Sequence, residues 1–545
     1  MMKIIFDKKE YSVDKEITVS EFVKSQNLEK TVLACKAKNR IIPPDYIVKD
    51  GDVINPITIS DDEGYLIYKE TLIIILLHAV EQLSDCSAVF IRQSVNKSTY
   101  FEIECSDITK AESAARIKEK MHSIIESGIV LKQRELSKND VATLFDSYGD
   151  SFRAKEISLL PAEKIRICET AKRCHITYQP LAYSISAVDN FDVQPYEEGF
   201  LLKYPTNYTV DTIPVIKSGE KVHRAIEDYR DWITTIGAED VFSLNSFVQK
   251  GKEADIVNLS EGLHEKRLSR IADSISENPD IKVILIAGPS SSGKTTFANR
   301  LCLHLRINHI EPIVISLDDY YVNDDRMPLD EKGEMDFECV EAIDYELFNE
   351  HLALLIEGKS VEIPKYDFNV RRRVKGKTIS IREGQILIVE GIHALNELLT
   401  SRVDKKNKYK IYLSALTSLC LDEYNAFSPT DNRLIRRMVR DAQFRNTPAK
   451  HTFKLWKSVR RGEQKYIFPF ESEADEVFNS SLVYELSVLK EPAIKLLETI
   501  GDDSEYYSKA IRLKELLSFF ETMKPDYIPP TSIIREFIGG STMVN

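Results

Sequence analysis

The sequence lacks the features that mark disulfide-rich, zinc-binding, secreted and membrane proteins. Its eight cysteines are scattered and form no Cys-x-x-Cys pair, which favours buried or free thiols in a reducing cytosol over a disulfide frame or a zinc site. The N-terminus carries no long apolar core of the kind that a signal peptide needs. The strongly apolar run Leu72 to Leu77 is far too short to span a bilayer and predicts a buried helix instead. We therefore expect a cytoplasmic protein without membrane association.

Basic residues are also in short supply. The chain has 73 Lys and Arg against 86 Asp and Glu, which gives a formal net charge of −13. Because nonspecific affinity for nucleic acid comes mainly from basic surface, this balance argues against a general nucleic-acid binder, although it leaves room for a local basic patch. The sequence contains no internal repeat and no low-complexity segment.

At 545 residues, the chain is longer than a single hydrophobic core normally supports, so we expect several domains. Residues 1–60 show short alternating runs and a turn signal, Lys49-Asp50-Gly51-Asp52, which predict a small ββαβ-type module. Helical and strand patterns are mixed over residues 61–215, and helical patterns dominate residues 216–279, which we interpret as a connector. A C-terminal helical extension is expected over residues 491–545.

Over residues 280–490, apolar strands alternate with helical segments. Continuous apolar runs of this kind suit a parallel sheet that is covered on both faces. The pattern predicts an α/β fold with a parallel sheet flanked by helices, preceded by a small β-rich module and an α+β region. The candidate strands are Val283–Ala287, Ile313–Leu317, Ile386–Val389, Ile411–Leu413 and Val477–Phe478.

The most informative stretch is the loop Gly288-Pro289-Ser290-Ser291-Ser292-Gly293-Lys294-Thr295. It follows the candidate strand Val283–Ala287 and precedes a helical pattern. A phosphate-binding P-loop requires this order of strand, loop and helix. The alternative interpretation, a flexible Gly/Ser turn, does not require it. The loop N–H groups and the start of the helix would face the phosphates. Lys294 can reach the β- and γ-phosphates, and the Thr295 hydroxyl can ligate Mg²⁺. The sequence thus predicts a nucleoside triphosphate site.

Carboxylates stand where two further strands are predicted to end. Ligands of an open parallel sheet bind beyond the carboxyl ends of its strands, which makes Asp318, Asp319 and Glu390 candidates. A carboxylate at each strand end can assist Mg²⁺ and orient an attacking hydroxyl, and phosphoryl transfer needs little else besides charge neutralisation. Turn chemistry is the favoured alternative for Asp319, and a structural role is favoured for His393.

Arginines cluster in a later helical stretch. Spacings of three and four place Arg433, Arg437 and Arg440 on one helical face. A solvated face normally mixes charges, so five arginines with only Asp441 among them predict a lid that faces an anion. The run Arg371-Arg372-Arg373 is explained equally well as surface charge. The five arginines are Arg433, Arg436, Arg437, Arg440 and Arg445.

Together these motifs resemble the uridine/cytidine kinase branch of the P-loop kinases, a family that also includes phosphoribulokinase; the match covers about residues 280–480. The resemblance implies ATP and Mg²⁺ as cofactors and a catalytic set of Asp318, Lys294, Arg437 and Arg440, with Asp318 aligning the hydroxyl that is phosphorylated. It implies a metal site made by Thr295, Asp318 and Glu390. It assigns ATP contacts to Gly288, Ser290, Ser291, Ser292, Gly293, Lys294, Thr295, Thr296 and Arg445.

Three shorter segments extend the resemblance to the substrate. Ser316-Leu317-Asp318-Asp319-Tyr320-Tyr321 resembles the family's Ser-x-Asp-x-[Phe/Tyr]-Tyr, and Ile363-Pro364-Lys365-Tyr366-Asp367-Phe368 resembles its Pro-x-Tyr-Asp-Phe. Asp336-Phe337-Glu338 resembles an Asn-Phe-Asp segment whose acid holds the ribose hydroxyls. One departure is clear, because Arg371 stands where uridine/cytidine kinases carry a base-reading histidine. The implied substrate contacts are Tyr321, Glu338, Tyr366, Phe368, Arg371 and Arg437.

The first half resembles other families. Residues 1–60 resemble the small ubiquitin-like TGS module, and residues 61–215 resemble the second N-terminal (editing) domain of threonyl-tRNA synthetase. That domain uses a His-x-x-x-His pair, which here reads His78-Ala79-Val80-Glu81-Gln82, and a later Cys-x-Gly-Pro-His element, which here reads Thr177-Tyr178-Gln179-Pro180-Leu181. We therefore expect His78 to be an ordinary histidine on its helix. The whole arrangement resembles a bacterial group of long uridine-kinase-like proteins.

The resemblance implies an ATP- and Mg²⁺-dependent kinase for the 5′-hydroxyl of a nucleoside, with uridine or cytidine as the first expectation. Arg371 favours a second enzyme hypothesis, a kinase for another small hydroxylated metabolite such as a sugar phosphate or a pantothenate-like acid. A third is an RNA- or tRNA-binding regulator with a nucleotide switch, which the acidic balance opposes. The base that is read, the ligand of residues 1–215 and the number of subunits stay open, and a homo-oligomer is compatible with the sequence.

Overall fold

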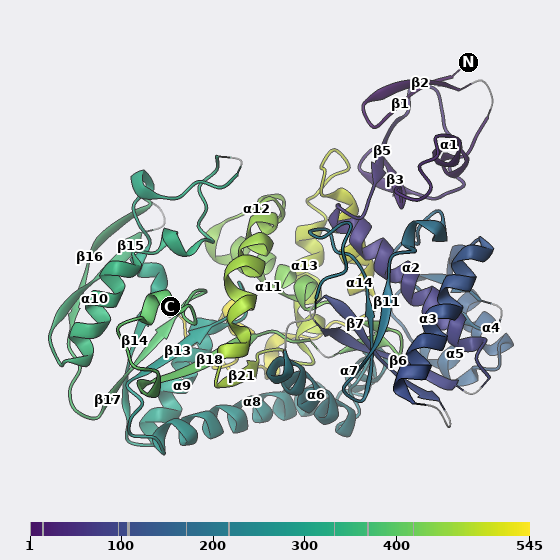
Figure 1. Ribbon diagram of the computed structural model, residues 1–545. Helices are drawn as coiled ribbons and strands as arrows, with labels where there is room; N and C mark the ends of the chain where they lie inside the picture. The colour runs from purple at the N-terminus through teal and green to yellow at the C-terminus, as the bar shows by residue number, and fades with distance from the viewer. Residues whose placement is uncertain are drawn as a thin grey trace.

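A five-stranded parallel sheet organises the C-terminal half of the protein (Figure 1). The strands occur in the order β14-β17-β13-β18-β21, and every neighbouring pair is parallel. They are the five strands predicted from the apolar runs, so the predicted α/β fold is confirmed. Their bounds are β13 (Val283–Ala287), β14 (Glu311–Ser316), β17 (Gln385–Glu390), β18 (Lys408–Ser414) and β21 (Glu476–Asn479). The computed structural model describes residues 2–13, 16–84, 86–95, 97–105, 109–170, 172–215, 219–331, 333–367, 370–417 and 419–544.

Helices cover both faces of this sheet. Ile284 and Ile286 of β13 belong to one hydrophobic core and Val283 and Leu285 to another, because alternate strand residues point to opposite faces. The first core is closed by α8, α9, α11 and α13, and the second by α10 and part of α6. The helices are α6 (Glu220–Thr235), α8 (Glu253–Ser276), α9 (Lys294–Ile307), α10 (Tyr345–Ile356), α11 (Pro429–Arg445) and α13 (Glu485–Leu497). Since both faces are covered, β13 is apolar throughout and wholly buried.

The first strands of the chain form a separate mixed sheet in the order β2-β1-β5-β3-β4, accompanied by one helix. The rings of Phe6 and Phe22 lie 5.2 Å apart in its core, and the helix begins with a capping box between Thr18 and Glu21. Figure 1 shows this module extending away from the rest of the protein. The bounds are β1 (Met2–Phe6), β2 (Lys9–Val13), α1 (Val19–Ser25), β3 (Ala34–Ala37), β4 (Arg40–Ile42) and β5 (Val53–Ile57).

The next region is built around α2 (Asp62–Glu81), a helix that buries the apolar run Leu72 to Leu77 as predicted. The helix begins at Asp62, well before this apolar run, and acidic residues occupy its first turn, where they interact favourably with the helix dipole. A sheet of the order β11-β12-β7-β6 packs against it, and a sheet of the order β10-β9-β8 contacts it through His175 and Glu81. Their elements are β6 (Cys86–Val95), β7 (Ser98–Cys105), α3 (Lys110–Ser127), β8 (Gln133–Ser137), α4 (Lys138–Ser147), α5 (Ser151–Ser158), β9 (Lys164–Glu169), β10 (Cys174–Ile176), β11 (Asp192–Tyr196) and β12 (Gly199–Lys203).

Two hairpins are absent from the predicted patterns, and one of them interlocks the two halves. The backbone N–H of Ile91 in β6 donates to the carbonyl of Glu423 at 2.8 Å, and the Tyr178 hydroxyl donates to Asp422 at 3.2 Å. Asp422 and Glu423 belong to the hairpin of β19 and β20, which leads directly into α11. The N-terminal half therefore meets the C-terminal half beside α11. The hairpins are β15 (Val361–Asp367) with β16 (Arg372–Ile379), and β19 (Cys420–Asp422) with β20 (Asn425–Ala426).

The remaining helices connect the halves and close the C-terminal end. In Figure 1, α8 runs along the lower side of the molecule from the parallel sheet toward α6 and α7. The boundary predicted at residue 490 falls inside α13, because that helix packs against the sheet core as one continuous element. The helices not yet given are α7 (Val241–Gln249), α12 (Ala449–Gly462), α14 (Tyr507–Ser518) and α15 (Arg535–Ile538).

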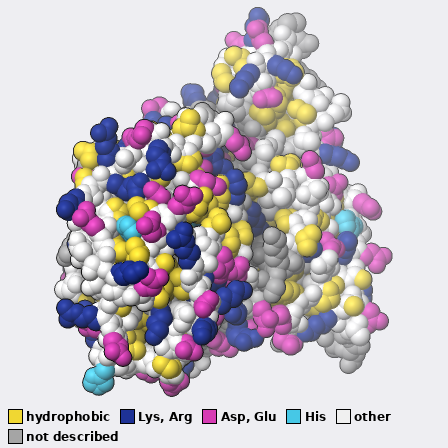
Figure 2. Space-filling view, turned by 60° about the vertical axis from the view of Figure 1, so that its left-hand side comes forward, with side chains coloured by type: hydrophobic (Ala, Val, Ile, Leu, Met, Phe, Trp, Pro, Cys, Tyr) yellow, Lys and Arg dark blue, Asp and Glu magenta, His cyan; other side chains and the backbone are white. Residues whose placement is uncertain are grey.

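Surface charge and cysteine pairing complete the description. On the face shown in Figure 2, basic and acidic side chains are interspersed, in keeping with the net charge of −13. Over the ranges that the structure describes, none of the helices is long and apolar enough to cross a membrane. Cys86 is disulfide-bonded, so the expectation of unpaired thiols is wrong there. Free thiols are found at Cys35, Cys168, Cys174, Cys302 and Cys339.

Candidate active site

The predicted phosphate-binding loop joins β13 to α9 at the carboxyl edge of the parallel sheet. Two of its residues have a left-handed backbone, Ser291 with φ 61° and Gly293 with φ 88°. Lys294 folds back over the loop, and its Nζ donates to the carbonyl oxygen of Gly288 at 3.0 Å. A Cβ on Gly288 would lie 1.8 Å from the carbonyl oxygen of Leu413, so only glycine lets the loop pass this close to β18.

The loop holds polar groups that are suited to an anionic ligand. The hydroxyls of Ser291 and Ser292 are buried and have no hydrogen-bond partner in the part of the chain that the structure describes. Burial lowers the pKa of Lys294, against the opposing effect of the Glu390 and Asp318 carboxylates. Buried polar groups normally find partners, and a phosphate would provide them here. The loop therefore fits a phosphate group.

Two carboxylates flank the loop. Glu390 ends β17, is buried, and accepts a 2.7 Å hydrogen bond from the hydroxyl of Ser316 at the end of β14. Asp318 comes just after β14 and stays exposed to solvent. Burial raises the pKa of Glu390 to about 7 and Asp318 adds to this, whereas Lys294 opposes it. Although Asp318 keeps access to solvent, the protein groups crowded around its side chain raise its pKa, and Lys294, Arg445 and Arg440 oppose this rise. Asp318 is thus accessible to a ligand while lying among the charges of the loop and α11.

The residues predicted to hold a metal ion supply one hydroxyl, from Thr295, and two carboxylates, from Asp318 and Glu390. Within the described ranges there is no group of three or more His, Cys, Asp or Glu that could hold a metal ion. Magnesium in phosphoryl-transfer sites is usually bound by one or two carboxylates together with substrate phosphates and water. The three side chains therefore fit Mg²⁺ that arrives with a nucleotide rather than a preformed metal centre.

Two of the five arginines in α11 form internal ion pairs. Arg433 pairs with Glu463 through both Nη atoms, and Arg436 pairs with Glu485, all four side chains being buried. Arg433 also donates from Nη1 to the carbonyl oxygen of Ser290 at 3.2 Å. The expectation that Arg433 faces an anion is therefore not met. Its charge is already compensated by Glu463, and its hydrogen bond to Ser290 holds the loop against α11.

The other three arginines share one carboxylate. Arg437, Arg440 and Arg445 each approach Asp441 to 3.3 Å. Arg437 also donates from Nη1 to the Ser290 hydroxyl at 2.9 Å, which joins α11 to the loop. Arg445, at the end of the helix, is 58% exposed. Three guanidinium groups around one shared carboxylate leave a surplus of positive charge beside the loop, which a triphosphate could compensate.

Some of the predicted substrate residues lie close to one another and to Asp318. The ring of Tyr321 lies 5.5 Å from that of Tyr366, and the Tyr321 hydroxyl donates to the carbonyl oxygen of Phe337 at 3.0 Å. Burial raises the pKa of the neighbouring Glu338 to about 7, and Arg437 opposes this increase. Arg437 is therefore close enough to act on both the loop and the predicted substrate side.

Three other predicted positions have different surroundings. Arg371 lies exposed in the turn between β15 and β16, with φ 51°. Phe368 falls outside the residues that the structure describes. The Asp319 carboxylate accepts the backbone N–H of Tyr366 at 3.2 Å, the local structural role that the turn interpretation favours.

The sequence does not reveal the carboxylates that form ion pairs with the arginines of α11. Glu463 directly follows α12 and Glu485 is the first residue of α13, so both are distant in sequence from the arginines with which they pair. Nothing in their local sequence indicates these partners. For Asp441 there is a weak signal, because Arg437 and Arg445 stand four residues to either side and such pairs meet on a helix. His393, interpreted as structural, is buried, and its ring lies edge-on to Tyr466 at 6.0 Å.

His78 of the N-terminal half is a buried residue of α2 that is bound by its neighbours. Its Nε2 lies 3.0 Å from the Gln82 amide nitrogen, and its Nδ1 lies 3.7 Å from Glu81. Glu81 is also 2.9 Å from Nε2 of His175. Burial alone would raise the pKa of Glu81, but the contacts with His175 and His78 outweigh it and lower that pKa to about 2. These contacts are those of a core histidine on its helix.

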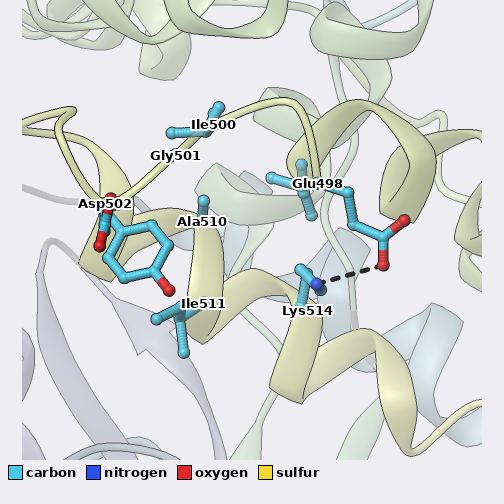
Figure 3. A pocket seen from close by; sticks show the side chains of 9 residues that line it. Glu498, Ile500, Gly501, Asp502, Ala510, Ile511 and Lys514 are labelled. Atoms are coloured by element: carbon cyan, nitrogen blue, oxygen red, sulfur yellow. Dashed lines mark hydrogen bonds and ion pairs between the residues drawn. The ribbon is translucent and has the colours of Figure 1, made fainter.

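A cavity of about 360 Å³ lies between α13 and α14 (Figure 3). At its edge, Lys514 forms a 3.2 Å ion pair with Glu498. No residue of the loop, of the strand ends or of α11 is among those that line it. This cavity is therefore separate from the candidate active site.

Comparison with known proteins supports the interpretation of the C-terminal half. Residues 283–486 match the model of the phosphoribulokinase / uridine kinase family. A uridine kinase from Ureaplasma parvum is 30% identical over 177 residues, which are 32% of this chain and 77% of the relative. A uridine kinase from Tolumonas auensis is 32% identical over 203 residues, 36% of this chain and 86% of the relative. A uridine kinase from Borrelia turicatae is 31% identical over 237 residues, 42% of this chain and 99% of the relative. Because it spans most of each of these relatives at such identity, the chain belongs, through its C-terminal half, to the phosphoribulokinase/uridine kinase family.

Proposed function

We propose that the protein transfers the terminal phosphoryl group of ATP to the 5′-hydroxyl of a nucleoside, with uridine or cytidine as the first candidates. The observation that carries the proposal is the convergence of Lys294, Asp318 and the arginines bound to Asp441 at one edge of the sheet. Phosphoryl transfer to an alcohol requires a held triphosphate, an oriented hydroxyl and compensation of developing charge. The names of the three relatives support the choice of a nucleoside.

The loop and the helix have separate roles under this proposal. Lys294 and the loop N–H groups would hold the β- and γ-phosphates. Mg²⁺, held by Thr295, Asp318 and Glu390, would supply further neutralisation of phosphate charge. Arg437 and Arg440 would stabilise the charge that develops on the transferring group, since Arg437 is hydrogen-bonded to Ser290 of the loop and Arg440 acts electrostatically on Lys294.

Asp318 would align the attacking hydroxyl and accept its proton. Its raised pKa suits this role, because a carboxylate that is less stable in its charged form takes up a proton more readily. Glu338 would accept hydrogen bonds from the ribose hydroxyls, and the neighbouring rings of Tyr321 and Tyr366, tilted by 58° to each other, would flank the nucleoside.

A second candidate is a kinase for another small hydroxylated compound that carries a negative charge. Arg371 motivates it, since this exposed cation acts electrostatically on Tyr366, a residue of the predicted substrate side. An additional arginine suits an anionic acceptor better than a neutral pyrimidine.

A panel of acceptors separates these candidates. The purified protein would be incubated with ATP and Mg²⁺ and with nucleosides, sugar phosphates or hydroxy acids, and ADP release would be measured together with the mass of the product. Formation of a nucleoside 5′-monophosphate supports the proposal, and preference for an anionic acceptor supports the second candidate. The Lys294→Ala variant serves as the control for contaminating kinases. Absence of any phosphomonoester with every acceptor would reject both.

A further inference from the structure

The last part of the chain lies against the phosphate-binding loop, although it is outside the family-matched residues 283–486. We call residues 528–544 the tail. Ile533 contacts the loop directly, since a Cβ on Gly293 would lie 2.5 Å from its Cγ2 atom. Figure 1 agrees with this placement, because the chain ends beside the parallel sheet rather than beside α14.

Several contacts fix the tail to the helices around the loop. The Asn299 side chain in α9 donates to the carbonyl oxygen of Met543 at 2.6 Å, and the Gln443 side chain in α11 donates to that of Ile538 at 3.1 Å. Phe537 is fully buried beneath the Arg436 guanidinium, 5.1 Å from the ring centre. Because the tail is buried and hydrogen-bonded to both α9 and α11, it is a well-ordered part of the candidate site.

Glu536 is a residue of the tail that contacts predicted active-site residues. Its Oε2 accepts a 2.8 Å hydrogen bond from the hydroxyl of Thr296, the residue that follows the loop's Lys294-Thr295 pair. Its Oε1 lies 3.8 Å from Nη1 of Arg440. The side chain is 12% exposed. Glu536 also opposes the lowering of the pKa of Lys294, so its charge acts across the loop.

These contacts distinguish Arg440 from the other two arginines around Asp441. Arg440 lies between two carboxylates, Asp441 at 3.3 Å and Glu536 at 3.8 Å. Two anchors restrict the direction of a guanidinium group more than one does, which reduces the entropy lost when it engages a phosphate.

We infer that Glu536 is a positioning residue of the kinase, supplied by the tail, which directs Arg440 toward the phosphates of the bound nucleotide and is itself held in place by the hydroxyl of Thr296. This inference rests on the proposed function. A fixed carboxylate so close to a triphosphate repels it in the ground state, so its benefit has to occur in the transition state. The contact therefore predicts an effect on turnover and none, or the opposite one, on nucleotide binding.

Steady-state kinetics of Glu536→Gln and Glu536→Ala, with ATP and acceptor varied separately, test this. We expect kcat to fall about tenfold in Glu536→Gln and further in Glu536→Ala, which also loses the contact to Thr296, while KM for ATP is unchanged or lower. Asp526→Asn removes an exposed carboxylate from the neighbouring part of the chain and is the matched control. Thermal unfolding of each variant shows whether the fold is retained.

The outcomes separate this inference from the proposed function. An unchanged kcat in both variants overturns the positioning role, and so does a higher KM for ATP at unchanged kcat. A fall in kcat that tracks loss of thermal stability across both variants indicates a structural role only and also overturns it. If the wild-type protein transfers no phosphoryl group, the proposed function fails, and equilibrium binding of a fluorescent ATP analogue takes over as the test. Weaker binding by Glu536→Gln than by wild type then rejects the inference, while equal or tighter binding supports it.

Discussion

The hydroxyl of Ser316 donates a 2.7 Å hydrogen bond to the carboxylate of Glu390, joining the ends of two adjacent strands. The two residues are register partners in the parallel pair β14–β17. This contact directs Glu390 toward the loop, because the carboxylate is held at the same edge of the sheet from which Lys294 and Asp318 approach. The position of Glu390 therefore follows from the register of the parallel sheet.

Asp318→Asn should separate binding from chemistry. The variant keeps the size of the side chain but cannot accept a proton, so we expect turnover to fall on the order of 10²–10⁴-fold while ATP binding is nearly intact. Single-turnover kinetics and calorimetric ATP titration measure the two quantities. Asp319→Asn is the matched control, since an amide oxygen can still accept the N–H of Tyr366. Unchanged turnover in Asp318→Asn would exclude this residue as the base.

The raised pKa of Glu338 predicts a dependence of substrate binding on pH. Burial raises this pKa to about 7, so the folded protein keeps Glu338 protonated where the unfolded chain ionises it. The direction of the effect on stability follows from the linkage between protonation and folding. Its contribution to stability is fully present below the ordinary glutamate pKa and is lost as pH rises toward about 7. Ionised Glu338 is the better acceptor for ribose hydroxyls, so KM for the nucleoside should fall as pH rises through about 7. Glu338→Gln should flatten the KM profile, and a profile identical to wild type would contradict the assignment.

The buried pair of Arg436 and Glu485 should dominate the stability of α11. Arg436 is 0% exposed and its partner 1%, and removing one member of such a pair leaves an uncompensated buried charge that costs about 3–5 kcal/mol. We expect Arg436→Met to lower the free energy of unfolding by this amount in chemical denaturation. Arg306→Met breaks the exposed pair with Glu311 and should change it by less than about 1 kcal/mol. Equal effects in the two variants would show that the pair in α11 is not energetically distinct.

Gly288→Ala should abolish the phosphate-binding loop. The added Cβ would lie 1.8 Å from a backbone carbonyl of β18, so either the loop or the strand has to move. We expect loss of ATP binding in titrations and a lower thermal midpoint. Gly262→Ala is the matched control within α8, where a Cβ meets nothing within 4 Å, and it should stabilise the helix by up to about 1 kcal/mol. Intact ATP binding in Gly288→Ala would contradict the loop geometry.

The sequence by itself determined the parallel sheet, the loop and the family of the C-terminal half. Apolar runs, a glycine-bounded loop and a following helix are local patterns, and they depend on short-range backbone and burial preferences. The same patterns did not predict the hairpins, whose strands are short or exposed and carry little periodic signal. The resemblances of residues 1–215 and the cytoplasmic location stay predictions.

Only the tertiary structure decided which charges meet. Five arginines in one helix look alike along the chain, yet Arg436 is neutralised by Glu485 and Arg440 lies between Asp441 and the distant Glu536. Ion pairing depends on distance in space and on burial, and neither is contained in the spacing of residues along a helix. The same holds for Ile533, whose contact with Gly293 joins the tail to the loop across the folded protein.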